Sequence, residues 1–220
     1  MKLNTYIDHT LLKANATEQQ IITLCQEATT HNFFSICINS GYVTLAKKNL
    51  LESEVKICTV VGFPLGAMST AAKICEAKKA IEDGASEIDM VLNIGLLKSK
   101  NYLEVFKDVD AVKRAIGNVT LKVIIEISEL SKNEIVEACK ICLDAKANFV
   151  KTSTGFSKGG ATLTAIRIMK KILKNKAKIK ASGGIKTAAI ALKYIELGVD
   201  RIGTSSGVGM MTNQSSNASH

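Results

Sequence analysis

Two lysines of this sequence, Lys151 and Lys180, stand inside otherwise apolar runs, NFVKT and KIKAS. A charged amine in a buried strand is costly unless it is paired or neutral. If the two runs form neighbouring strands about 4.8 Å apart, both amines cannot easily carry a proton. A neutral lysine amine is a nucleophile that forms a Schiff base with a carbonyl compound. The pair therefore indicates amine catalysis at Lys151, although a lysine that reaches the surface or pairs with a carboxylate gives the same pattern.

A carboxylate, Asp89, lies in a third apolar run, EIDMVL. Carbon–carbon chemistry through a Schiff base requires protons to move between a hydroxyl group, the amine and a carbon atom. Asp89 beside the two lysines is a candidate for that transfer, directly or through water. The alternative is a structural carboxylate that accepts hydrogen bonds from a loop or pairs with Lys122.

Two glycine-rich segments near the end of the chain are typical of phosphate sites. SGGIK follows the run that holds Lys180, and GTSSG follows the last apolar run. Glycine lets backbone N–H groups approach an anion, and a helix that begins there favours negative charge. Each segment alone is equally a plain tight turn. The candidate phosphate-binding residues are Gly183, Gly184, Gly203, Ser205 and Ser206, with Lys158 and Lys186 as further sources of positive charge.

The elements that must hold these residues are short apolar runs that alternate with helical patterns. Their near-continuous apolar character is typical of parallel strands buried on both faces. Successive runs from residue 33 on begin roughly 20–35 residues apart, which leaves room for one strand and one helix in each interval. Eight strands are expected, at 6–9, 33–39, 55–61, 87–92, 121–127, 148–152, 178–182 and 200–204.

Eight such units predict a single-domain (β/α)8 barrel, a TIM barrel, in which functional residues lie at the carboxyl ends of the strands. A doubly wound open sheet is the alternative, but it usually has a glycine-rich turn after its first strand, and none follows residues 33–39. We expect the barrel to span residues 1–208. The polar residues 209–220 are expected to form a frayed tail.

Helix ends are marked within this series. Thr17 with Gln20, and Ser131 with Glu134, have the spacing of capping boxes. Gly84 and Gly198 follow helical patterns, where a left-handed residue commonly ends a helix.

Composition narrows the class of protein. The chain has 220 residues, 46% of them hydrophobic, which excludes a disordered chain. No apolar run reaches the roughly 20 residues of a membrane span, and the first residues do not resemble a secretory signal, so a cytoplasmic location is expected. The net charge of +9 comes almost entirely from lysine, with few arginines or aromatics, which favours a lysine-rich soluble surface over a nucleic-acid-binding one. An anionic small substrate fits the same charge.

Six cysteines lie mostly in apolar strings and are expected to pack in the core. Cys139 and Cys142 form a C-x-x-C pair, but a metal site would need a second pair of ligands, and histidines are few. No metal site is predicted.

The motifs together are similar to those of the deoxyribose-phosphate aldolase family. They run from residue 6 to about residue 208: YIDHTLLK, SICIN, CTVVGFPLG, EIDMVLNIG, LKVIIE, FVKTSTGF, KASGGI and RIGTSSG. The resemblance implies a class I aldolase without metal or organic cofactor. It would cleave 2-deoxy-D-ribose 5-phosphate reversibly to glyceraldehyde 3-phosphate and acetaldehyde, in deoxynucleoside breakdown. A homodimer is also consistent with the family.

By the same resemblance, Lys151 is the Schiff-base lysine, Lys180 keeps it neutral, and Asp89 transfers protons. Asp8, Thr10 and Cys37 would lie at the substrate end, a role that the residue pattern alone does not indicate. Two departures stand out: Ala14 occupies a position where the family commonly has proline, and the sequence ends without the tyrosine that assists proton transfer in some members.

Two other functions remain open from the sequence. One is a different Schiff-base aldolase that acts on another phosphorylated sugar. The other is a non-catalytic barrel that binds a polyanion through its lysines. A polyanion binder would carry those lysines on an exposed face, whereas a Schiff-base enzyme would bury them within strands.

Overall fold

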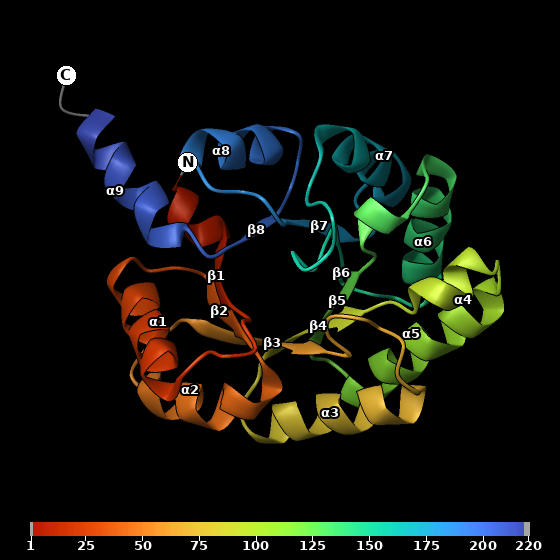
Figure 1. The fold of residues 1–220 in the computed structure, drawn as a ribbon, viewed down its shortest axis with the longest axis horizontal. Coiled ribbons are helices and arrows are strands. Elements are labelled where there is room, and N and C mark those ends of the chain that lie inside the picture. The colour runs from red at the N-terminus through yellow and green to blue at the C-terminus, as the bar shows by residue number, and fades with distance from the viewer. Residues whose placement is uncertain (1, 218–220) are drawn as a thin grey trace.

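The protein is a closed barrel of eight parallel strands, described here by a computed structural model of residues 2–217, with side chains described to residue 212. The strands occupy the centre of Figure 1, in sequential order, and β1 pairs with both β2 and β8. The predicted (β/α)8 fold is confirmed. The strands are β1 (Ile7–Leu11), β2 (Ser35–Ile38), β3 (Lys56–Val61), β4 (Glu87–Val91), β5 (Thr120–Ile124), β6 (Phe149–Lys151), β7 (Lys178–Ser182) and β8 (Arg201–Thr204).

Helices surround the barrel and bury its outer face (Figure 1). The α-helices are α1 (Glu18–Thr30), α2 (Val43–Asn49), α3 (Thr70–Glu82), α4 (Ile94–Lys98), α5 (Tyr102–Ile116), α6 (Lys132–Asp144), α7 (Leu163–Leu173), α8 (Ala188–Glu196) and α9 (Gly207–Asn217). Three short 3-10 helices are η1 (Leu3–Tyr6), η2 (Ser40–Tyr42) and η3 (Ile127–Glu129). Within the described part of the chain, none of the helices has the length and apolar character needed to cross a membrane.

The predicted helix ends form as expected. Thr17 and Gln20 begin α1 with a reciprocal capping box, and Ser131 and Glu134 do the same for α6. Each box provides partners for two backbone N–H groups that the first turn of a helix leaves free. These caps fix where two helices start against the barrel.

Strand register brings the charged residues of the interior together. Asp89 of β4 is paired with Lys122 of β5, and Lys180 of β7 is paired with both Lys151 of β6 and Arg201 of β8. Paired residues on neighbouring parallel strands point to the same side of the sheet. The register therefore directs these side chains into one layer of the barrel.

The prediction of a frayed tail from residue 209 is wrong for the residues that the structure describes. Helix α9 begins at Gly207 and packs against α8 and η1. Met210 is buried, and Val208 and Met211 pack against the core, so three apolar side chains anchor a segment whose composition is otherwise polar. Residues 218–220 of the predicted tail lie outside the described residues.

Candidate active site

A pocket of about 310 Å³ lies at the carboxyl ends of the strands around β6, β7, β8 and β1. This is the end of a (β/α)8 barrel where loops and strand ends form active sites. The pocket is lined by residues 10–13, Lys151, 154–156, 182–186 and 203–206. Residues from four separate segments of the chain thus meet around one cavity.

Lys151 ends β6 and reaches the floor of this pocket. Its side chain is only 2% exposed, and its Nζ lies 2.8 Å from Oδ2 of Asp89. The amine is therefore shielded from bulk water yet still accessible from the pocket. That is the placement required of a nucleophilic lysine.

Lys180 lies beside Lys151 on the neighbouring strand, as the sequence predicts. Its Nζ lies 2.8 Å from the same Oδ2 of Asp89 and 2.6 Å from Oδ2 of Asp8. Burial favours the neutral amine, but the two carboxylates outweigh it and hold the pKa of Lys180 well above its usual range. Lys180 therefore keeps its proton and is a fixed positive charge near Lys151.

Asp89 is the carboxylate that joins these amines. Its Oδ2 accepts hydrogen bonds from Lys151 and Lys180, and its Oδ1 accepts one from Lys122 at 2.9 Å. Burial alone would raise its pKa, but the three lysines reverse that effect and hold the pKa of Asp89 well below its usual range. Asp89 pairs with Lys122, as the structural interpretation expects, and it also touches the two candidate catalytic lysines, a contact that proton transfer would require.

The residues implied only by family resemblance lie around and beneath this group. Thr10 lines the pocket, and its hydroxyl donates to the backbone oxygen of Asp8. Asp8 is fully buried below the pocket, where it pairs with Lys180 and Arg201. Burial raises the pKa of Asp8, but Lys180, Arg201 and Lys122 outweigh it and lower that pKa to about 2. Cys37 is also fully buried and does not line the pocket.

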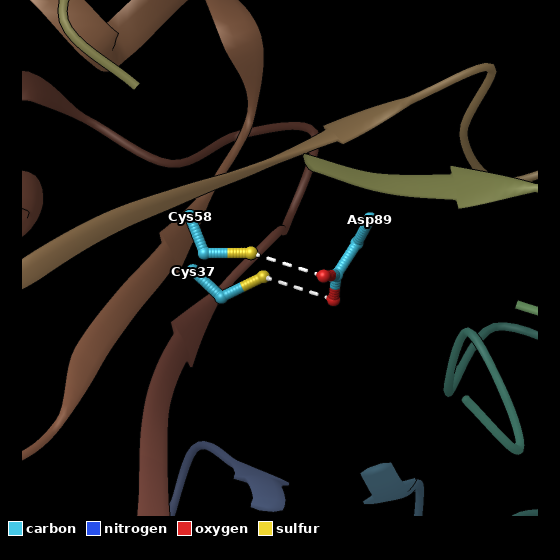
Figure 2. A group of neighbouring side chains, drawn as sticks. All are labelled: Cys37, Cys58 and Asp89. Carbon is cyan, nitrogen blue, oxygen red and sulfur yellow. Dashed lines mark hydrogen bonds between the residues drawn. The ribbon is translucent and has the colours of Figure 1, made fainter. Parts of the chain in front are cut away.

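Figure 2 shows Cys37 and Cys58 pointing at Asp89 from β2 and β3. The Cys58 Sγ lies 3.1 Å from Oδ1 and the Cys37 Sγ lies 3.9 Å from Oδ2. Their three ligand atoms lie within 4.8 Å of one another, a spacing at which a metal ion could be held. Three lysine amines already touch the same carboxylate, so a cation would meet strong repulsion there. The donor set is better suited to binding ammonium groups than a metal.

The thiols differ in their ionisation. A hydrogen bond from Cys58 lowers the pKa of Cys37 to about 7 against the opposing effect of burial. Burial, followed by the contact with Cys37, raises the pKa of Cys58 well above its usual range. By contrast, Cys139 and Cys142 are buried in the hydrophobic core, as predicted, and burial raises the pKa of both.

The two glycine-rich segments meet at one side of the pocket. All five candidate phosphate-binding residues line it, and so does Lys186. Gly183 and Gly184 have φ values of +88° and +75°, which glycine adopts without strain. Helix α9 begins immediately after Ser206, so its positive end faces the same region. Neutral donors, glycine backbone and a helix terminus therefore surround a space suited to an anion.

Lys158 is not part of this arrangement. It is largely exposed, pairs with Glu129 at 3.2 Å and is absent from the pocket lining. Lys13 lines the pocket instead, in the loop after β1. The sequence alone did not indicate which lysines reach the pocket, because that depends on the conformation of the loops after β1 and β6.

Sequence reasoning also missed three charged or polar groups that support the site. Glu87 and Arg201 are buried beneath the pocket, where they pair with each other at 3.3 Å. Glu126 is buried and accepts hydrogen bonds from the backbone N–H and the hydroxyl of Thr154, a pocket residue. The only signal for Glu87 is its spacing two residues before Asp89, which puts both on the same face of a strand.

Comparisons with known proteins agree with this geometry. The model of the DeoC/LacD family aldolases matches residues 2–211. A deoxyribose-phosphate aldolase 1 of Mesoplasma florum is 51% identical over 220 residues, covering all of both chains. A deoxyribose-phosphate aldolase of Finegoldia magna is 56% identical over 208 residues, covering 94% of this chain and 98% of that one. The solved tetrameric deoxyribose phosphate aldolase of Aeropyrum pernix superposes with a TM-score of 0.89 at 30% identity, covering 98% and 92% of the two chains.

Proposed function

The chain belongs to the DeoC/LacD family of aldolases, and on that basis we infer its reaction and the roles of its residues. The protein is a class I deoxyribose-phosphate aldolase, a carbon–carbon lyase. It cleaves 2-deoxy-D-ribose 5-phosphate reversibly into D-glyceraldehyde 3-phosphate and acetaldehyde, in the degradation of deoxyribonucleosides. The observation that carries the residue assignment is the contact of two buried lysines with one oxygen of Asp89 at the floor of the pocket.

Lys151 is the nucleophile in this proposal. Its neutral amine attacks the C1 aldehyde of the open-chain sugar, and loss of water gives a Schiff base. The protonated Schiff base withdraws electrons from the C2–C3 bond. Lys180, which stays protonated, places a fixed positive charge beside Lys151, on the same oxygen of Asp89.

Asp89 transfers the protons that the cleavage requires, directly or through water. A base removes the proton of the C3 hydroxyl, the C2–C3 bond breaks, and glyceraldehyde 3-phosphate leaves. The electrons of that bond form an enamine, which takes up a proton at C2. Hydrolysis of the resulting Schiff base then releases acetaldehyde and returns the free amine of Lys151.

The phosphate group is held by the two glycine-rich segments and Lys186 in this assignment. The backbone N–H groups of Gly183, Gly184 and Gly203, with the hydroxyls of Ser205 and Ser206, supply donors without a full positive charge. A phosphate bound there orients the sugar so that its aldehyde end points towards Lys151, which lines the same pocket.

The burial of the lysines argues against one of the two alternative functions but not against the other. A polyanion binder needs accessible lysines, whereas Lys122, Lys151 and Lys180 are at most 2% exposed. A Schiff-base aldolase for another phosphorylated sugar would use the same lysines, and substrate competition separates it from this proposal. A homodimer and a cytoplasmic location stay predictions from the sequence.

Intact mass after treatment with acetaldehyde and sodium borohydride tests the nucleophile. Reduction of the Schiff base adds ~28 Da, one ethyl group in place of hydrogen, to the wild-type protein. We expect Lys151→Ala to lose this adduct. The control Lys140→Ala changes an exposed residue on α6 and should keep it. A folded wild-type protein without an adduct would overturn the assignment of Lys151.

A further inference from the structure

Six buried charged side chains inside the barrel form a closed ring in which acids and bases alternate. Each acid touches two bases, and each base touches two acids. In order around the ring they are Asp89, Lys122, Glu87, Arg201, Asp8 and Lys180, which pairs again with Asp89. Five strands contribute to it: β1, β4, β5, β7 and β8.

The contacts around the ring are all short. Lys122 Nζ lies 2.9 Å from Asp89 and 2.7 Å from Glu87. Arg201 reaches Glu87 at 3.3 Å through Nη2 and Asp8 at 2.8 Å through Nη1. Lys180 closes the ring, at 2.6 Å from Asp8 and 2.8 Å from Asp89.

Opposite charges on both sides favour the charged form of five members of the ring. For these five, burial works against the charged form, but the flanking charges outweigh it. The pKa values of Lys122, Lys180 and Arg201 are therefore raised, and those of Asp8 and Asp89 are lowered. With Glu87 as the third anion, three negative charges balance three positive charges.

Lys151 is a fourth cation beside this balanced ring. Asp89 is its one ion-pair partner among the described residues, whereas every base of the ring has two. An uncompensated buried charge is strongly disfavoured, so protonated Lys151 is the surplus charge of the group.

We propose that Glu87 and Arg201 are positioning residues that set the protonation of Lys151 through the charge balance of this ring. Neither residue lines the pocket, and each acts through its partners on Asp89 and Lys180. This inference rests on the proposed role of Lys151 as the Schiff-base lysine.

Several other groups face the Lys151 amine and belong to the same electrostatic balance. Asp89 and Lys180 are nearest, Lys122 lies on the other oxygen of Asp89, and Cys37 and Cys58 approach that carboxylate from β2 and β3. Lys13 and Lys186 line the pocket above. The substitutions proposed below leave all of these groups in place.

The ring predicts opposite effects for its two distant members. Glu87→Gln removes a negative charge, so the amine of Lys151 loses its proton at lower pH. Arg201→Met removes a positive charge while keeping an apolar side chain against the ring of Phe34, so the proton is retained to higher pH. The double variant restores a neutral ring and should return the profile towards wild type.

The experiment measures kcat/KM for 2-deoxy-D-ribose 5-phosphate against pH and records the midpoint of the acid limb. We expect the two single variants to move the midpoint in opposite directions by on the order of half to one pH unit. Glu137→Gln removes a partly exposed charge on α6, outside the ring, and should leave the midpoint in place. If Glu87 and Arg201 were purely structural, both single variants would have a lower kcat/KM but their pH midpoints would not shift in opposite directions. The double variant would then have a still lower kcat/KM.

Arg201→Lys provides a second route if a neutral substitution prevents folding. Arg201→Lys keeps the positive charge at this position, so the midpoint of the acid limb should stay at the wild-type pH even if kcat falls. Equal midpoints for Arg201→Lys, Arg201→Met and wild type would overturn the inference. The two proposals can fail separately. If only Lys151→Ala loses the borohydride adduct but the midpoints of the ring variants do not move, the role of the ring is refuted and the proposed function stands.

Discussion

Asp8 illustrates at the residue scale how one buried carboxylate ties stability to pH. Its pKa falls from 3.8 to about 2 in the folded protein because Lys180 and Arg201 outweigh the effect of burial. A carboxylate with a lowered pKa in the folded protein stabilises the folded state at pH values above its pKa in the unfolded chain. This stabilisation is lost as the pH falls through its pKa in the folded protein. The relevant window is therefore pH 3.8 to about 2.

We predict that Asp8→Asn destabilises the protein by on the order of 2 kcal/mol at pH 7, because it removes this contribution. The difference in free energy of unfolding between wild type and variant should shrink as pH drops through the window. Urea unfolding followed by circular dichroism at about pH 7, 4, 3 and 2 measures it. A difference that stays constant with pH would show that the carboxylate is not ionised against its partners.

Residue types predicted the core of the site but not its full extent. Lys151, Lys180 and Asp89 interrupt apolar runs, and a charge in such a run is visible in the sequence. Arg201 and Glu87 stand at the first positions of their strands, where a charged residue is ordinary, and the spacing of Glu87 two residues before Asp89 is the only signal for either. Their pairing depends on strands β4 and β8, which are far apart in the sequence and meet across the barrel interior.

At the scale of elements, the loop after β6 and the glycine-rich loop after β7 are packed backbone against backbone. A Cβ atom at Gly160 would lie 2.2 Å from the backbone oxygen of Gly183, far inside normal contact. Ala161 N–H also donates to the backbone oxygens of Ser182 and Gly183. The first loop therefore supports the segment assigned to the phosphate.

Gly160→Ala should push these two loops apart. We expect KM for 2-deoxy-D-ribose 5-phosphate to rise several-fold with a smaller change in kcat, and stability to fall by about 1–3 kcal/mol from overpacking. Steady-state kinetics and urea unfolding measure the two effects. Gly41→Ala is the matched control, because a Cβ there meets no atom within 4 Å. An unchanged KM would mean that the contact does not support substrate binding.

Element positions were predicted well wherever an apolar run was bounded by turn residues, and all eight strands overlap their predicted ranges. The end of the chain was predicted poorly because serine and asparagine suggest a tail. Three apolar side chains, Val208, Met210 and Met211, were enough to hold α9 against the barrel. Three apolar residues are too few to form a recognisable helical pattern in a single sequence.

For the molecule as a whole, the net charge of +9 favours the approach of a negatively charged substrate. Salt screens such attraction over roughly 10 Å at 0.1 M. We therefore predict that kcat/KM for 2-deoxy-D-ribose 5-phosphate falls as sodium chloride is raised. Unphosphorylated 2-deoxy-D-ribose is the control, and its kcat/KM should change little. An equal response of both sugars would point to a general effect of salt on the enzyme.

The contact between Arg201 and Asp8 joins the last strand of the barrel to the first. The chain must therefore be folded from β1 to β8 before all six charges of the ring can come together. In a partly assembled barrel the lysines would be hydrated, and a hydrated lysine amine is protonated at neutral pH and a poor nucleophile. The environment that surrounds the amine of Lys151 is therefore completed only when the last strand closes the barrel against the first.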